Sequence, residues 1–280
     1  MKKILIIAAL LLPVAAWAQF GARTSVGADV KIKKGLHLEA EEELRLGGGQ
    51  SGIDNVRTTL GIDWKVNKYL KLGGGYTLIN PYKFKYDDDG NLTYKGFWYP
   101  RHRLYVNATG TMRYGDFQFS LKEKLQFTHR TDDSLNVYQN VRNALALKSR
   151  VGVKYRGLKD YGVEPFAYFE IRTALNEPWG TTSGSLQTTA NSKKDYYSYT
   201  HTGYTHVYNN RYRVNLGADW TPVKKHSITA NILLDWCSDY EIDTNSPSKW
   251  AEKGVRLFTA TTGWVDTFCP SVCIGYKYSF

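Results

Sequence analysis

Beyond residue 18 the chain lacks any apolar run of 18 residues, which excludes a helical membrane span in that part. Cysteine and proline are scarce as well, with 3 and 8 among 280 residues. Three cysteines are too few for a disulfide scaffold, although a bridge from Cys237 to Cys269 or to Cys273 stays open. Cys269 and Cys273 have no accompanying histidine pattern, so no metal ligands are assigned. Few prolines suit long regular strands and disfavour a disordered chain.

The first residues have the pattern of an export signal. Lys2 and Lys3 give a positive start, residues 4–16 are apolar, and Ala16-Trp17-Ala18 forms a small-x-small cleavage site. The apolar run is interrupted by Pro13 and is shorter than the roughly 20 residues of a spanning helix, which argues against an uncleaved anchor. We therefore expect a cleaved signal peptide over 1–18 and a single domain over 19–280.

Aromatic residues and positive charge are abundant. The chain has 21 Tyr, 11 Phe and 8 Trp, and a formal net charge of +11. A mean hydropathy of −0.44 is usual for a soluble protein. It is equally compatible with transmembrane strands, in which apolar and polar residues alternate. Export makes nucleic acid an improbable partner, so the basic charge is expected to meet lipopolysaccharide phosphates or anionic solutes.

The main structural signal is alternation with a period of two. In the first segment Val26, Val30 and Ile32 share one face, and Asp29 and Lys31 share the other. The pattern returns over 36–46, 56–66, 70–78, 101–112, 117–127, 145–154, 163–172, 211–220, 228–236 and 272–280. Glu42 breaks the apolar row of its segment, which suggests a bulge or a strand end.

The connections between these segments alternate in length. Short ones are expected at 33–35, 67–68, 114–116 and 222–225, and long ones at 80–100, 129–143, 176–206 and 238–254. Together with export, this predicts a closed antiparallel transmembrane β-barrel of 10 to 12 strands, with turns on one side and long loops on the other. A count of 12, with 255–265 as an extra strand, is favoured because an even count closes antiparallel, but it would place Phe280 outside. With fewer strands the first one would start outside. Tyr276, Tyr278 and Phe280 are expected to be the signal for the barrel assembly machinery.

Several stretches resemble a known family. They are 147–172 (LKSRVGVKYRGLKDYGVEPFAYFEIR), 209–236 (NNRYRVNLGADWTPVKKHSITANILLDW), 101–110 (RHRLYVNATG) and 274–280 (IGYKYSF). The chain resembles a bacterial outer-membrane family catalogued as domain of unknown function 2490. The resemblance implies a barrel in the outer membrane of a Gram-negative bacterium, and it implies no activity and no catalytic or binding residues.

An enzyme is not expected. A lipid-modifying barrel needs a serine with a histidine base, and His226 and Ser227 are neighbours on opposite strand faces. Gly47–Gly49 and Gly73–Gly75 lack a following phosphate-binding lysine, so strand flexibility or close approach explains them better. Residues 87–91 resemble part of a calcium loop without its distal glutamate. No cofactor is predicted.

The polar face is the candidate site. Its basic members could attract anions into a narrow pore, since rings of Arg and Lys favour anions. They are Arg57, Arg101, Arg103, Lys122, Lys124, Lys148, Arg150, Arg172, Arg211 and Arg213. Its acidic members are Glu39, Glu41, Glu43, Glu164, Glu170, Asp219 and Asp235.

Three roles remain open for this face and for the loops. The lumen could be a small channel for polar or anionic solutes, or the charged ladders could pair and fill it as a structural barrel. A third role is ligand binding by a loop rich in tyrosine, whose members could instead extend an aromatic girdle. They are Tyr196, Tyr197, Tyr199, Tyr204, Tyr208 and Tyr212.

Overall fold

The alternating segments form long strands that wrap into a closed barrel in the computed structural model, which describes residues 20–47, 52–82, 85–86, 92–94, 99–132, 140–189, 192–245 and 259–280. The strands are β1 (Gly21–Lys33), β2 (Leu36–Leu46), β3 (Ile53–Lys65), β4 (Leu70–Pro81), β5 (Lys85–Tyr86), β6 (Leu92–Tyr94), β7 (Arg101–Tyr114), β8 (Phe117–Arg130), β9 (Asn143–Tyr155), β10 (Val163–Thr189), β11 (Ser192–Val223), β12 (His226–Asn245) and β13 (Thr259–Ser279). A single 3₁₀ turn, η1 (Lys159–Tyr161), joins β9 to β10. None of the helical segments in the described ranges is long and apolar enough to cross a membrane.

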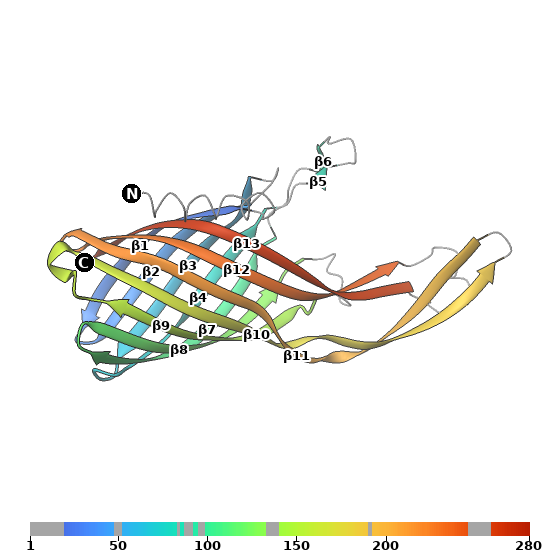
Figure 1. Ribbon diagram of the computed structural model, residues 1–280, viewed down its shortest axis with the longest axis horizontal. Helices are drawn as coiled ribbons and strands as arrows, with labels where there is room; N and C mark the ends of the chain where they lie inside the picture. Colours follow the sequence, from blue (N-terminus) through green and yellow to red (C-terminus); the bar gives the residue numbers. More distant parts are fainter. Residues whose placement is uncertain are drawn as a thin grey trace, which may run out of the picture.

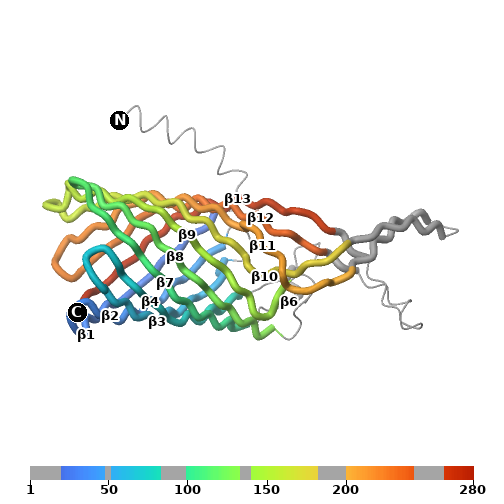
Figure 2. The backbone as a smooth tube through the Cα atoms, turned by 90° about the horizontal axis from the view of Figure 1, so that it is seen from below, coloured from blue at the N-terminus to red at the C-terminus, as the bar shows by residue number. Residues whose placement is uncertain are grey.

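Eleven strands close the wall in the order β1-β13-β12-β11-β10-β9-β8-β7-β4-β3-β2. The small β5–β6 hairpin lies apart, within the connection from β4 to β7. Figures 1 and 2 show the wall as a tilted sheet, with the tight turns and the C-terminus gathered at one end. We call this the short-turn end, and the opposite one the long-connection end.

The barrel closes through a parallel pair. Gly21 pairs with Ser271 and Asp29 with Ser279, so β1 and β13 run in the same direction. All other neighbours in the wall are antiparallel. The closed barrel and the range of 10 to 12 strands are confirmed, whereas the favoured count of 12 and the wholly antiparallel closure are wrong.

The length of the last strand explains why the count is odd and the closure is parallel. Residues from Thr259 onward form no separate strand, because they continue β13, which pairs with β12 from Thr259 to Tyr278. The count is therefore odd, and β1 begins at the long-connection end, where Ala22 pairs with Leu46. Phe280 lies at the short-turn end, and its backbone N–H donates to the Asp29 carbonyl at 2.8 Å.

One predicted loop is instead a pair of strands. The segment 176–206 continues β10 and β11 as a paired hairpin, with register shifts between Arg172 and Gly180 where it leaves the wall. Figure 1 shows this hairpin projecting far beyond the barrel at the long-connection end. Residues 238–245, also read as loop, extend β12. The other long connections join strands at the expected end.

The two faces of the wall have opposite chemistry. Val26, Leu60, Leu104 and Ile274 are more than half exposed on the outer face, while the largest buried polar groups point inward. The strand register is regular at Glu42, which pairs with Val26 of β1 and with Thr58 of β3. The predicted bulge or strand end there is therefore wrong, and Glu42 lies in the outer row.

A second carboxylate also occupies the outer face. Glu123 lies between Leu121 and Leu125 in the outer row of β8, and the Ser149 hydroxyl donates to its Oε2 at 2.6 Å. Both outer carboxylates are several residues away from the strand ends.

Some predictions concern residues outside the described ranges. These are the signal peptide, the glycines Gly48 and Gly49 and the calcium-like segment 87–91. The side chains of Tyr196, Tyr197 and Tyr199 also lie outside the described part, and the segment 255–258 is likewise not described.

Candidate functional site

The polar residues of the lumen form three layers along the barrel axis, and each has its own charge balance. Two cavities, of about 430 Å³ and about 530 Å³, follow one another along the lumen: the first reaches Lys277 toward the short turns, and the second reaches Glu177 and Asp239 toward the long connections. Six residues line both cavities and thus form the layer between them: Arg45, Arg57, Arg103, Gln126, Lys148 and Arg213. We call the cavity of about 430 Å³ the lower cavity and the other the upper cavity.

The layer at the short-turn end consists of neutralised pairs. Lys277 Nζ lies 2.9 Å from Glu39 Oε1, and Lys71 Nζ lies 2.7 Å from Asp63 Oδ2. Across the lumen, Lys154 Nζ lies 2.6 Å from Asp219 Oδ2. Lys71 and Asp63 lie on the paired strands β4 and β3. Lys277 reaches Glu39 across β1, and Lys154 reaches Asp219 across β10, so strand order and side-chain length bring these partners together.

Arg156 and Glu164 complete this layer, with the guanidinium Nε 2.9 Å from Oε1. Side chains of opposite charge therefore occupy the lumen next to the turns. Such paired charges leave little net field to attract a solute from this side.

The middle layer is a buried ionic network. Glu170 and Asp235 are each 3% exposed, and Arg213 lies between them at 6%. Arg213 donates from Nη1 to Glu170 at 3.2 Å and from Nη2 to Asp235 at 2.7 Å. Arg150 donates twice to the second Glu170 oxygen, at 2.9 and 2.5 Å, and Lys148 Nζ lies 3.6 Å from the first.

This network joins several strands of the wall. Asp235 also pairs with Arg211 at 3.5 Å and with Arg23 at 3.7 Å, so it ties β12 to β11 and to β1. Tyr168 supports the network from below, because the Arg150 guanidinium lies 4.0 Å from its ring centroid. The Tyr168 hydroxyl in turn accepts a hydrogen bond from Asn215 at 2.7 Å.

The upper cavity has an excess of cationic side chains. Nine Arg and Lys residues line it, against the three carboxylates Glu177, Asp239 and Glu241. Those carboxylates lie on the strand portions furthest from the turns, beyond Arg172 on β10 and beyond Cys237 on β12. The carboxylates of the cavity therefore lie on its β10 and β12 side, near the mouth, while Arg101 and Arg130 lie at the strand ends of β7 and β8.

Three of these guanidinium groups have no carboxylate partner among the described residues: Arg103, Arg130 and Arg172. Arg103 Nε donates to Thr128 at 2.9 Å, and Arg130 Nη1 donates to Asn140. Cationic groups that face a cavity without a counter-ion favour an anion from solution.

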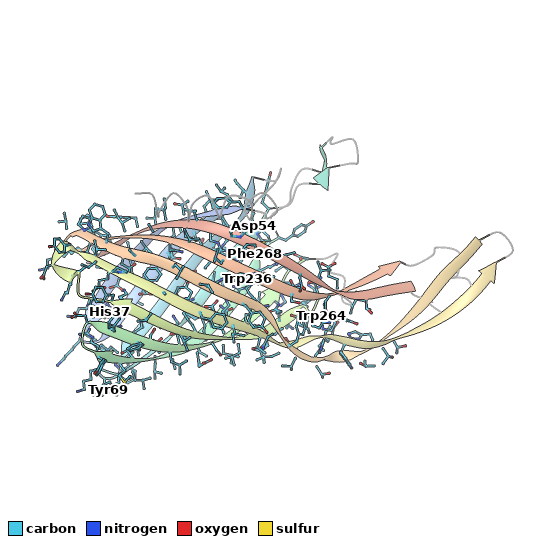
Figure 3. All side chains as sticks on the ribbon, viewed as in Figure 1. His37, Asp54, Tyr69, Trp236, Trp264 and Phe268 are labelled. Atoms are coloured by element: carbon cyan, nitrogen blue, oxygen red, sulfur yellow. The ribbon has the colours of Figure 1, made fainter. Side chains whose placement is uncertain are left out.

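An aromatic cluster adjoins the upper cavity. Tyr208 and Tyr240 line the cavity and both contact the Trp264 ring, with centroids 5.0 and 5.2 Å apart. The His206 ring lies between Trp179 and Tyr208, at 4.5 and 4.9 Å. Figure 3 places Trp264 where the long strands leave the barrel, so this cluster borders the mouth.

Two glycines make room for an aromatic side chain in the lumen. A Cβ at Gly75 would come within 2.6 Å of the Tyr105 hydroxyl, and one at Gly61 within 2.8 Å. The Lys124 ammonium lies 3.5 Å from the centroid of the Tyr105 ring. Of the two explanations for the glycines at 73–75, close approach of a side chain to the backbone therefore applies at Gly75.

The structure brings the predicted charged residues into one lumen. Those that line a cavity are Glu41, Glu43, Arg57, Arg101, Arg103, Lys124, Lys148, Arg150, Arg172, Arg211 and Arg213. Glu39, Glu164, Glu170, Asp219 and Asp235 are held in ion pairs instead. Lys122 lies in the same inward row of β8 as Lys124, and its backbone pairs with Thr109 and Arg150.

Other lumen residues were not singled out from the sequence. Arg23 and Arg45 share the polar faces that alternation identified, and Lys277 lies between two aromatic residues of the last strand, so the same rule would have found them. Arg130 and Glu177 lie in segments that were read as loops, which explains why they were missed.

The remaining candidates for chemistry have structural partners. His226 is hydrogen bonded to Tyr276 at 2.8 Å and His102 to Tyr76 at 2.6 Å, not to serine. The three cysteines are free thiols, and Cys237 Sγ accepts a hydrogen bond from Arg211 at 3.2 Å. Within the described ranges no group of three His, Cys, Asp or Glu side chains is arranged to hold a metal ion.

Comparison with known proteins identifies the family. The family model described as "Protein of unknown function (DUF2490)" matches residues 20–220. The chain belongs to this family. The part that matches the DUF2490 model runs from the start of β1 into β11. It includes Glu170 and Arg213 of the middle layer, while Asp235 lies beyond it. No curated protein matches the chain.

Proposed function

We propose that the chain is a non-enzymatic outer-membrane barrel that admits polar, anionic solutes into its lumen from the long-connection end. The observation that carries the proposal is the upper cavity, in which nine cationic side chains face three carboxylates. A basic cavity with walls of low dielectric constant concentrates anions.

The outer surface supports a place in a membrane. Large apolar side chains are exposed all around the wall, although a soluble protein would bury them. Exposed aromatics flank them at the short-turn end, with Trp64, Tyr69 and Tyr114, and at the mouth, with Trp179 and Trp264. Figure 3 shows Tyr69 and Trp264 at opposite ends of the barrel. Such paired girdles are typical of barrels in the outer membrane.

The expected orientation puts the short turns in the periplasm and the long connections outside. An exported chain with the C-terminal aromatics Tyr276, Tyr278 and Phe280 fits assembly by the barrel machinery. The upper cavity then opens toward the medium, where the outer-leaflet lipopolysaccharide is the neighbouring lipid.

Conductance in planar bilayers tests the proposal. The purified barrel should conduct, and its reversal potential in a salt gradient should show preference for chloride over potassium. The double variant Arg101→Gln/Arg103→Gln should lower that preference, because both side chains line the upper cavity. The control Lys33→Gln/Lys65→Gln removes the same charge from exposed positions at the short-turn end and should change it less.

Two results would contradict this proposal. An intact, folded barrel without conductance removes the channel, and conductance with equal preference for both ions removes the role of the arginines. Release of fatty acids from labelled phospholipid vesicles by the purified protein would favour a lipid-modifying enzyme instead.

A further inference from the structure

We infer that the upper cavity is a binding site for a compact polyanion, a solute that carries two or more phosphate or carboxylate groups. This inference rests on the proposed function, since it names the class of solute that the basic lumen selects. The inference treats binding of the solute and its passage through the barrel as separate properties. Binding is assigned to the upper cavity, and the buried network beneath it restricts passage.

The cavity has the size of a ligand site. Its volume of about 530 Å³ falls within the roughly 300–1,000 Å³ typical of small-molecule pockets. Its walls are almost entirely polar, with eight arginines, one lysine, amides and tyrosine hydroxyls, and three carboxylates, so cationic groups outnumber anionic ones. A solute held here would be recognised by charge and hydrogen bonds, because few apolar side chains are available.

The unpaired guanidinium groups are spread over the wall. Arg103 is on β7, Arg130 on β8 and Arg172 on β10, and β9 lies between the last two. Since neighbouring strands are about 4.8 Å apart, the backbones of β7 and β10 are separated by about 14 Å along the wall. A single small anion can bridge adjacent guanidinium groups, whereas a solute with several anionic groups can satisfy all three.

The floor of the cavity adds further cationic groups that already have partners. Arg213 and Lys148 face the upper cavity while they pair with Glu170 on the network side. The Arg213 Nε atom is buried without a hydrogen-bond partner. Because this atom is closed off from solvent, Arg213 adds its positive charge to the floor of the cavity and not a hydrogen bond from Nε.

The layers below the cavity restrict movement toward the short turns. Glu170, Asp235 and Arg213 are nearly fully buried, and the layer at the short-turn end consists of neutralised pairs. A polyanion that enters from the long-connection end therefore meets a basic cavity first and a buried ionic network second. The structure favours retention of the solute in the upper cavity.

Calorimetric titration of the folded barrel in detergent tests this with inorganic probes. Tripolyphosphate should bind at least tenfold more tightly than orthophosphate, and citrate should show whether carboxylates serve as well as phosphates. The triple variant Arg103→Gln/Arg130→Gln/Arg172→Gln should weaken tripolyphosphate binding at least tenfold. The charge-matched control Lys33→Gln/Lys65→Gln/Lys224→Gln should stay within twofold of the unmodified protein, because those lysines are exposed at the short-turn end.

A conservative variant covers the case in which the triple variant does not fold. Arg172→Lys keeps the charge but loses the fork of donors, so it should weaken tripolyphosphate binding while citrate or orthophosphate binding changes less. Equal affinity for tripolyphosphate and orthophosphate, or equal losses in the arginine variant and the lysine control, would overturn the inference.

The outcome is independent of conduction. A barrel that binds tripolyphosphate but carries no current would refute the channel and leave the site in place. A barrel that conducts chloride without discriminating between the two phosphates would do the reverse. In a conducting barrel, tripolyphosphate should block the current when added at the long-connection side and not at the other side.

Discussion

The buried Glu170 carboxylate gives the sharpest test of the lumen network. Glu170→Gln keeps the size of the side chain and removes its charge, which leaves Arg150 and Lys148 without a carboxylate in the described lumen. Arg213 retains Asp235 at 2.7 Å, so the network is weakened and not abolished. Removing one partner of a buried ion pair costs about 3–5 kcal/mol, and the remaining Asp235 contact places the expected loss near the lower limit, about 3 kcal/mol.

A matched variant at the short-turn end provides the control. Glu164 pairs with Lys154 at 3.4 Å and with Arg156 at 2.9 Å, but its side chain is 20% exposed against 3% for Glu170. Water screens this pair, so Glu164→Gln should cost about 1 kcal/mol or less.

Urea unfolding of the refolded barrel in lipid vesicles measures both effects. The seven tryptophans that follow the predicted signal peptide supply the fluorescence signal, and linear extrapolation gives the free energy of unfolding. The reasoning would be refuted by a loss below about 1 kcal/mol for Glu170→Gln, or by equal losses for the two variants. Either result would mean that solvent reaches the middle layer and that the Glu170 ion pairs are screened by water.

Three further expectations follow from the outer face, the strand directions and the thiols. Glu123→Leu should stabilise the barrel in vesicles by about 1–2 kcal/mol, because a carboxylate midway along a lipid-facing strand is unfavourable; an unchanged or lower urea midpoint would indicate that a partner covers this position. Because β1 starts at the long-connection end, an epitope placed just before Gly21 should be cleaved by protease added to intact cells, and one placed after Phe280 should be protected; the opposite pattern would reverse the proposed orientation. All three cysteines should react with a maleimide after unfolding without reductant, and loss of two reactive thiols would instead reveal a disulfide.

Much of the wall could be predicted because side-chain alternation is a local property. In β8 the apolar residues Phe119 and Leu121 alternate with Lys122 and Lys124, and this alone assigns their faces. The same rule assigns the charged lumen residues to the inner face without any information on the register.

The strand count and the charge pairing could not be predicted in this way. The direction of β1 relative to β13 depends on where the chain finishes its circuit, which no single segment encodes. Glu170 and Arg213 are 43 residues apart, and only the register of β10 on β11 brings them together. Conversely, the projecting part of β10 and β11 is rich in Gly, Ser and Thr, so it was read as a loop.

The parallel seam means that the two ends of the folded domain lie on opposite sides of the molecule. A circular permutant would therefore need a linker that runs from Phe280 back up the full height of the wall to Gly21, a path of about 13 extended residues if it follows β1. If such a linker alternated apolar and polar residues, it could enter between β13 and β1, antiparallel to both. The result would be a twelve-stranded cylinder of even count, so that a protein engineer could convert this wall into the more common architecture by adding one strand at its seam.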